Sequence, residues 1–200
     1  MPALAGTGTL LVQAIRYALG CVADLAPPCL TRPTPCAEWD VAALLRHVND
    51  SLAGLHEGIT TGRISLDPTE PSTHVRAHAL VETFRERAAQ LLAVARALGQ
   101  DDRLITIADR YVAESRVAAV GTVEVAVHGW DVATACGRDQ PIPTGLAVGI
   151  LKIVPLVVTD AIRLTRFAPP VTMSVPATPS DRLVALLGRC PRISTPGPGH

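Results

Sequence analysis

The sequence predicts a mostly α-helical protein built as a bundle, and three observations support that prediction. Hydrophobic residues make up 48% of the 200-residue chain and aromatic residues only 3%, which suits closely packed helices better than a sandwich of β-sheets. Apolar residues recur at helical spacing over five long segments, separated by stretches that contain proline and glycine. The length fits one domain with a substantial core.

The first two helices follow from apolar spacing and from signals at their ends. Apolar residues at helical spacing over residues 10–25 predict a helix that stops before Pro27 and Pro28. A loop over residues 31–38 follows. Asp40 is the expected N-cap of a second helix over residues 41–59, because its carboxylate can accept a hydrogen bond from the first turn.

Three further helices and one short strand are predicted beyond a crossover loop at residues 62–73. Apolar and β-branched residues at 104–108 predict a strand or an extended connection. The last of the three helices should bend at Pro155, which removes a backbone hydrogen bond. The expected helical ranges are residues 75–98, 115–135 and 144–167.

The C-terminal region, residues 168–200, holds 7 of the 17 prolines and should be mainly extended. A short helix over residues 181–187, closed by Gly188, is the exception. We expect this region to be a proline-rich extension of the bundle, so that residues 1–200 form a single domain without internal repeats.

Composition argues against several classes of function. The 18 basic and 18 acidic residues balance and Lys152 is the only lysine, so a basic surface for nucleic acid is missing. We find no signal-peptide pattern, and the most apolar stretch, residues 146–164, is interrupted by charged residues and a proline. We therefore expect a cytoplasmic protein without nucleic-acid or membrane partners, and a homodimer stays open.

The five cysteines are odd in number and never form a Cys-x-x-Cys pair. This spacing suggests neither a disulfide framework nor a thiolate zinc site. The cysteines are Cys21, Cys29, Cys36, Cys136 and Cys190.

Glu124 and His128 are the strongest candidates for chemistry. Four residues apart on a helix, they lie about 40° apart around the axis and one turn apart along it, so both can bind one ion. They share a stripe predicted to face the core, where an unpaired charge is costly. The alternatives are a divalent metal that pairs with them and a buried Glu–His hydrogen bond without metal. The stripe comprises Val117, Val120, Glu124, Val127, His128, Asp131 and Ala135.

His47, on the second helix, completes a candidate three-ligand metal site. It lies at the edge of the apolar face of that helix, so it can point into the bundle. Asp131, one turn after His128, can accept a hydrogen bond from a ligand imidazole and orient it from the second shell of the metal. A cap or hydrogen bond at the helix end is the alternative for Asp131.

Other polar and aromatic residues are assigned simpler roles. Trp39 and Trp130 are expected to pack, with the wall of a pocket as the alternative. His74 and His78 are expected on a solvated face, and His56 lies on the face of its helix opposite the candidate ligand. Three arginines are candidates for binding an acidic thiol or substrate, although scattered arginines usually lie on the surface. They are Arg46, Arg110 and Arg116.

Two separated motifs carry a family resemblance. One is Thr-Pro-Cys-Ala-Glu-Trp-Asp-Val at residues 34–41, followed by His47, and the other is Glu-Val-Ala-Val-His-Gly-Trp-Asp at residues 124–131. They resemble the actinobacterial branch of the DinB-like superfamily, which includes the mycothiol-dependent maleylpyruvate isomerase N-terminal domain. Residues 181–189 also resemble the closing segment of metal-binding members, so the resemblance covers nearly the whole chain.

The resemblance implies a four-helix bundle that binds a divalent metal, and carried over to this sequence its ligands are His47, Glu124 and His128. Zinc is the first expectation, with nickel, iron or manganese as alternatives. Three protein ligands leave open coordination positions, and two imidazoles and one carboxylate leave a net charge of about +1, which suits stabilising a thiolate or hydroxide. The resemblance also implies mycothiol as a co-substrate.

Three functions from different classes follow. The first is a metal-dependent enzyme that activates a small, mycothiol-like thiol for S-transfer to, or isomerisation of, an electrophilic metabolite. The second is a thiol-independent metal Lewis-acid enzyme for hydrolysis, rearrangement or cyclisation. The third is a non-catalytic small-molecule-binding bundle. Maleylpyruvate isomerisation itself is not favoured, because the resemblance implies that an extra C-terminal domain contributes to it.

Overall fold

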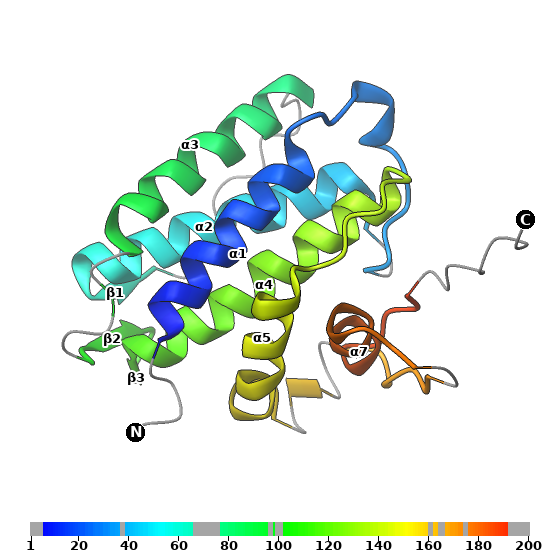
Figure 1. Ribbon diagram of the computed structural model, residues 1–200. Coiled ribbons are helices and arrows are strands. Elements are labelled where there is room, and N and C mark those ends of the chain that lie inside the picture. Colours follow the sequence, from blue (N-terminus) through cyan, green and yellow to red (C-terminus); the bar gives the residue numbers. More distant parts are fainter. Residues whose placement is uncertain are drawn as a thin grey trace, which may run out of the picture.

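The bundle consists of four long helices (Figure 1). Their bounds are α1 (Thr7–Val22), α2 (Val41–Thr61), α3 (Ala77–Ala95) and α4 (Glu114–Ala135). Helix α1 packs against α3 and α4, and α2 packs against the same two helices. The predicted mostly α-helical fold is therefore confirmed. The computed structural model describes residues 6–36, 39–65, 77–95, 98, 102–159, 162–163, 167–173 and 176–191.

The helix boundaries differ from the predicted ones by a few residues. Helix α1 begins and ends three residues earlier than apolar spacing predicted, and α4 begins one residue earlier. Helix α3 is described from Ala77 to Ala95, and parts of the predicted helix on either side of it lie outside the described residues. His74 and the side chain of His78 also lie outside them.

The ends of α2 are encoded locally. The Asp40 carboxylate accepts a hydrogen bond from the Ala43 backbone N–H at 2.7 Å, as expected for an N-cap. At the other end Gly62 has a φ of 73°, in the left-handed region that glycine adopts without steric cost. This glycine ends the helix two residues beyond the end that the apolar spacing predicted.

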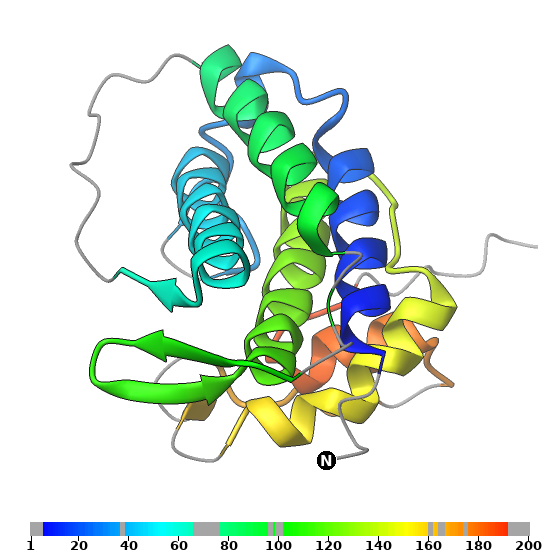
Figure 2. The same ribbon diagram turned by 90° about the vertical axis from the view of Figure 1, so that its left-hand side faces the viewer.

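A small three-stranded sheet lies across one end of the bundle (Figure 2). Strands β1 (Arg63–Ile64) and β2 (Leu104–Ile107) run parallel, and β2 pairs with β3 (Arg110–Ala113) in an antiparallel hairpin. The predicted strand is thus β2, but β3 was not predicted. The hairpin turn places Ala108 at a φ of 51°, a conformation that glycine or asparagine adopts more readily than alanine. Because neither residue stands at this turn, the sequence did not indicate a hairpin.

Helix α5 (Thr144–Val157) packs against α4 and α1 and is shorter than predicted. It passes through Pro155 and ends two residues later, where Val158 leaves the helical region with a ψ of 81°. The predicted unbroken helix to Phe167 is therefore wrong at Val158 and Thr159, although residues 162 and 163 are again helical. Proline lacks the N–H that would bond to the preceding turn, so the last turn of the helix is weakened there.

The C-terminal region is tied to the bundle through α7 (Pro179–Leu186), which packs against α5. Thr178 and the Asp181 side chain form a capping box, so this helix begins two residues earlier than predicted. Leu183 is fully buried, and the Ser180 hydroxyl accepts a hydrogen bond from the Ile142 N–H at 3.0 Å. This packing fixes the position of the residues that follow the helix.

Helix α4 lies close to its neighbours because glycines face them. A Cβ atom at Gly129 would lie 3.1 Å from the Ala18 Cα on α1, and one at Gly121 would lie 2.5 Å from a Leu55 methyl carbon on α2. The backbone next to His128 is therefore held directly against α1. Among the described residues, no helix combines the length and apolar character needed to cross a lipid bilayer.

Candidate metal centre

The structure brings His47, Glu124 and His128 together. Glu124 Oε1 contacts His47 Nε2 and lies 3.2 Å from His128 Nε2. The three candidate ligand atoms all lie within 4.8 Å of one another. One carboxylate oxygen thus stands between two imidazole nitrogens that come from two different helices.

The two helices place these side chains for different reasons. On α4 the four-residue spacing stacks Glu124 over His128, and His128 is buried. On α2 the neighbours Leu44 and Val48 are buried, while the His47 side chain is 37% exposed. The cluster is therefore buried on the α4 side and open to solvent at His47.

Asp131 and Arg189 extend the cluster inward. Asp131 Oδ2 lies 3.0 Å from His128 Nδ1, and Asp131 is fully buried. Arg189, which follows α7, donates to both oxygens of this carboxylate, from Nη2 at 2.9 Å and from Nε at 3.3 Å. The sequence analysis did not single out Arg189, although it closes the third segment of the family resemblance.

The charges in the cluster shift its pKa values. Burial alone lowers the pKa of His128, but hydrogen bonds with Asp131 and Glu124 and their negative charges raise it to about 9. Burial raises the pKa of Glu124, yet hydrogen bonds with His128 and His47 bring it far below its ordinary value. The carboxylate is therefore ionised at neutral pH and ready to pair with a cation.

The donor set fits a divalent transition metal. His128 Nδ1 is occupied by Asp131, which fixes the ring tautomer that leaves Nε2 as the ligand atom. Two imidazole nitrogens and one carboxylate oxygen suit zinc, and also nickel, iron or manganese. His47, Glu124 and His128 would hold such an ion from three sides.

Trp39 lies against both histidines. Its ring centroid is 4.7 Å from that of His47 and 6.4 Å from that of His128. The backbone oxygen of Trp39 accepts hydrogen bonds from the Thr34 N–H at 3.0 Å and the Thr34 hydroxyl at 2.9 Å, which fold the loop. Trp39 therefore forms a wall of the cluster, whereas Trp130 is buried in the core as a packing residue.

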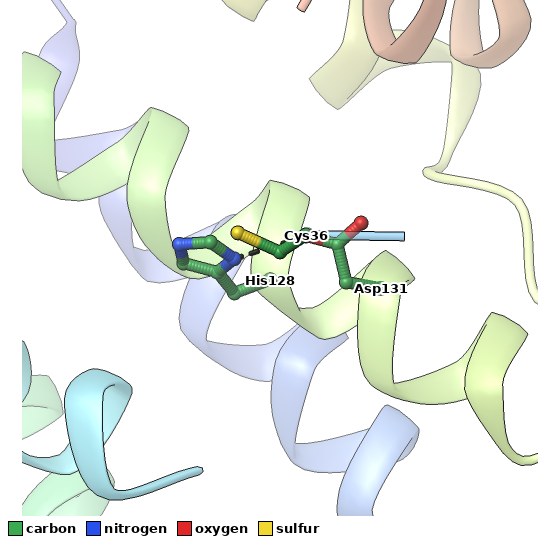
Figure 3. A group of neighbouring side chains, drawn as sticks. All are labelled: Cys36, His128 and Asp131. Atoms are coloured by element: carbon green, nitrogen blue, oxygen red, sulfur yellow. Dashed lines mark hydrogen bonds and ion pairs between the residues drawn. The ribbon is translucent and has the colours of Figure 1, made fainter. Parts of the chain in front are cut away.

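Cys36 is a second neighbour that the sequence analysis did not place at the site. Its Sγ lies within 4.8 Å of a ligand atom of His128 and of Asp131, and Figure 3 shows the sulfur beside the imidazole. Burial raises the pKa of this thiol, and Arg189 opposes that effect only in part. Cys36 lies in the 34–41 motif, which was the signal in the sequence for its position.

Several candidates from the sequence lie elsewhere. The three arginines proposed to grip an acidic thiol are exposed, and none contacts the histidine cluster in the described part of the chain. Val120 was placed on the buried stripe of α4 but is 48% exposed, which is a correction to that stripe. The three arginines are Arg46, Arg110 and Arg116.

Comparisons with known proteins show the family of this chain. Residues 11–133 match the model of the mycothiol maleylpyruvate isomerase N-terminal domain family. Uncharacterised proteins from two strains of Mycobacterium tuberculosis are each 30% identical over 162 residues, which is 80% of this chain and 85% of theirs.

A solved structure shares the fold. The crystal structure of the mycothiol-dependent maleylpyruvate isomerase aligns with a TM-score of 0.60 at 18% identity, over 79% of this chain and 70% of that one. The resemblance deduced from the sequence motifs is thereby confirmed. Because the family model spans more than half of the sequence, this chain belongs to the mycothiol maleylpyruvate isomerase N-terminal domain family, with a DinB-like fold.

Proposed function

We propose that this chain is a divalent-metal-dependent enzyme that uses a low-molecular-weight thiol of the mycothiol kind to act on an electrophilic small metabolite. The reaction is S-transfer to the metabolite or its isomerisation. The observation that carries the proposal is the contact of the Glu124 carboxylate with His47 and His128, in a chain of this family. The solved family relative is itself described as mycothiol-dependent.

Each residue of the cluster has a distinct role in the proposed site. His47, Glu124 and His128 would hold a divalent ion, which when bound supplies a Lewis acid that favours a thiolate at neutral pH. Asp131 holds the proton on His128 Nδ1 and so keeps Nε2 free as a ligand. Trp39 packs against the rings of both histidines and forms one wall of the site.

The reacting sulfur comes from outside the protein in this proposal. Cys36 is close to the cluster, but it groups with Asp131 and His128, away from the Glu124 side where the ligand atoms converge. Its raised pKa keeps it a neutral thiol, which is a weak nucleophile. An imported thiol can enter where His47 is exposed.

The first experiment is the metal content of protein purified without chelator, measured by elemental analysis. We expect about one equivalent of zinc, nickel, iron or manganese in the wild type and a loss of this metal in His47→Ala. His56→Ala is the matched control, because His56 lies on the same helix and belongs to neither candidate metal-binding group of the described residues. A wild type that takes up no metal even after reconstitution overturns the proposal.

The second experiment separates the thiol-dependent reaction from its rivals. The metal-loaded protein is incubated with a panel of electrophiles, with and without mycothiol, and the products are identified by mass spectrometry. A product that requires mycothiol supports the proposal. Turnover without any thiol indicates a metal Lewis-acid enzyme, and unchanged ligand binding in His47→Ala indicates a non-catalytic binding bundle.

A further inference from the structure

Arg189 is buried at the inner end of the histidine cluster, and all three nitrogens of its guanidinium group have acceptors. Nε and Nη2 donate to the two oxygens of Asp131, and Nη1 donates to the backbone oxygen of Leu187 at 2.9 Å. Only 7% of the residue is exposed to solvent. The guanidinium group is therefore held in one orientation, by a carboxylate on α4 and by a carbonyl of its own segment.

The backbone that carries Arg189 is also held in place. Gly188 has a φ of 81°, and the Arg189 N–H donates to the Val184 backbone oxygen at 2.9 Å, which closes the end of α7. A Cβ at Gly188 would lie 2.5 Å from the Ala168 backbone oxygen, so this turn lies directly against the segment that precedes α7. The arginine thus reaches Asp131 from a backbone that packing and hydrogen bonds fix.

The ring of His128 needs a restraint that its own torsions do not supply. The χ2 torsions of histidine and aspartate have broad minima, so neither an imidazole nor a carboxylate has a fixed plane by itself. Asp131 Oδ2 lies 3.0 Å from His128 Nδ1, and the dashed line in Figure 3 marks this contact. Because Arg189 holds both oxygens of the carboxylate, the orientation of the carboxylate in turn fixes that of the ring.

The other imidazole of the cluster lacks this support. His47 Nε2 contacts Glu124, and in the described part of the chain no carboxylate pairs with its Nδ1. The His47 side chain is 37% exposed, whereas that of His128 is 8% exposed. The cluster therefore has one imidazole that is held from inside the core and one that lies near the surface.

We propose that Arg189 is a positioning residue of the metal centre. By fixing both oxygens of Asp131, it sets the plane of the His128 ring, so that Nε2 faces the Glu124 carboxylate. A ligand that is already held in place loses less freedom when it binds an ion, so the arginine raises the metal affinity of the site without contacting the metal. The inference rests on the proposed function, because it needs the three candidate ligands to hold an ion.

The test combines two measurements on the full chain. One is the affinity for zinc, measured by competition with a chromophoric chelator, and the other is the visible spectrum of the cobalt(II)-loaded protein, which reports the arrangement of the ligands. We expect Arg189→Gln to lower the zinc affinity about 10-fold or more and to change the cobalt spectrum. Arg189→Lys keeps a charge for Asp131 but loses the two-point contact, so its zinc affinity should be intermediate. If Arg189→Gln does not fold, the lysine variant decides.

Arg103→Gln is the matched control for stability. Two guanidinium nitrogens of Arg103 contact Oε1 of Glu114, a buried carboxylate at the start of α4. Glu114 lies ten residues before Glu124 on this helix, which is about 15 Å along its axis. This change also leaves a buried carboxylate without its arginine, but far from the histidine cluster. Its zinc affinity and cobalt spectrum should therefore match those of the wild type.

A double variant tests whether Arg189 acts through Asp131. In the Asp131→Asn background, Arg189→Gln should cause little further loss of zinc affinity, because the carboxylate that it orients is gone. Wild-type affinity and spectrum in both Arg189 variants, an equal loss of affinity in Arg103→Gln, or losses that add in the double variant would each overturn this inference alone. A wild type that takes up no divalent metal overturns the proposed function, and the inference with it.

Discussion

Arg189 and Asp131 form a buried two-point ion pair, with Nη2 2.9 Å from Oδ2 and Nε 3.3 Å from Oδ1. Asp131 Oδ2 also contacts His128 Nδ1 at 3.0 Å. A residue beyond α7 is therefore linked through one carboxylate to a candidate metal ligand on α4. Because Asp131 is fully buried, these partners offset the cost of removing its carboxylate from water.

Replacing Arg189 should destabilise the fold. Arg189→Ala leaves the Asp131 carboxylate buried without its guanidinium partner, so we expect a loss of about 3–5 kcal/mol in the free energy of unfolding, measured by urea denaturation. The double variant with Asp131→Asn should recover part of this loss, because the unpaired charge is gone. A loss below about 1 kcal/mol in Arg189→Ala would contradict the pairing.

Removing the charge of Asp131 should weaken metal binding. Asp131→Asn loses the carboxylate that orients His128, so we expect the affinity for zinc to fall about 10- to 100-fold, measured by competition with a chromophoric chelator. Asp109→Asn, at the exposed hairpin turn, is the control and should bind zinc like the wild type. Equal affinities in the two variants would show that Asp131 does not support the site.

Metal should stabilise the folded protein through Glu124. At a free zinc concentration of about 100 times Kd, binding to the native state adds about 2.7 kcal/mol, which should raise the Tm by roughly 5–10 °C in thermal unfolding. Glu124→Gln keeps the shape but loses the charged oxygen between the histidines, so this rise should largely vanish. Glu57→Gln, a change on α2 at a residue outside both candidate metal-binding groups of the described residues, should retain it. A full rise in Glu124→Gln would place the zinc elsewhere.

A side chain added at the contact between α1 and α4 should destabilise the fold. In Gly129→Ala the new methyl group would lie 3.1 Å from the Ala18 backbone, so we expect a loss of about 1–3 kcal/mol in the free energy of unfolding. Gly145→Ala, on α5 with open space around it, should instead be neutral or stabilising by up to about 1 kcal/mol. Calorimetry of both variants checks the sign, and equal effects would contradict the close packing.

Much of the bundle was predictable because its signals are local. Apolar spacing gave the helices, and Asp40 marked the start of α2 through its short side chain. The separation of Glu124 and His128 implied a shared helix face, which needs no tertiary information. The predicted convergence of His47 on that face used the family resemblance as well, and the structure places it there.

The features that were missed depend on contacts between distant segments. Apolar spacing and helix-end signals do not place Arg189 and Cys36 beside Asp131, because these contacts arise from the packing of α7 and from the position of the loop that precedes α2. Strand β3 was missed because its turn lacks the residues typical of a hairpin. The length of α5 was overestimated because apolar spacing continued beyond Pro155.

The link from Arg189 to His128 limits how this protein can be shortened. The family match ends at residue 133, so a fragment cut there would keep all three candidate ligands and Asp131 but lose the arginine. Its innermost carboxylate would then face the core with no cation from the C-terminal segment. Such a fragment would contain the three candidate ligands but would lack the ion pair that holds Asp131. Metal titrations should therefore use a chain that extends past Arg189.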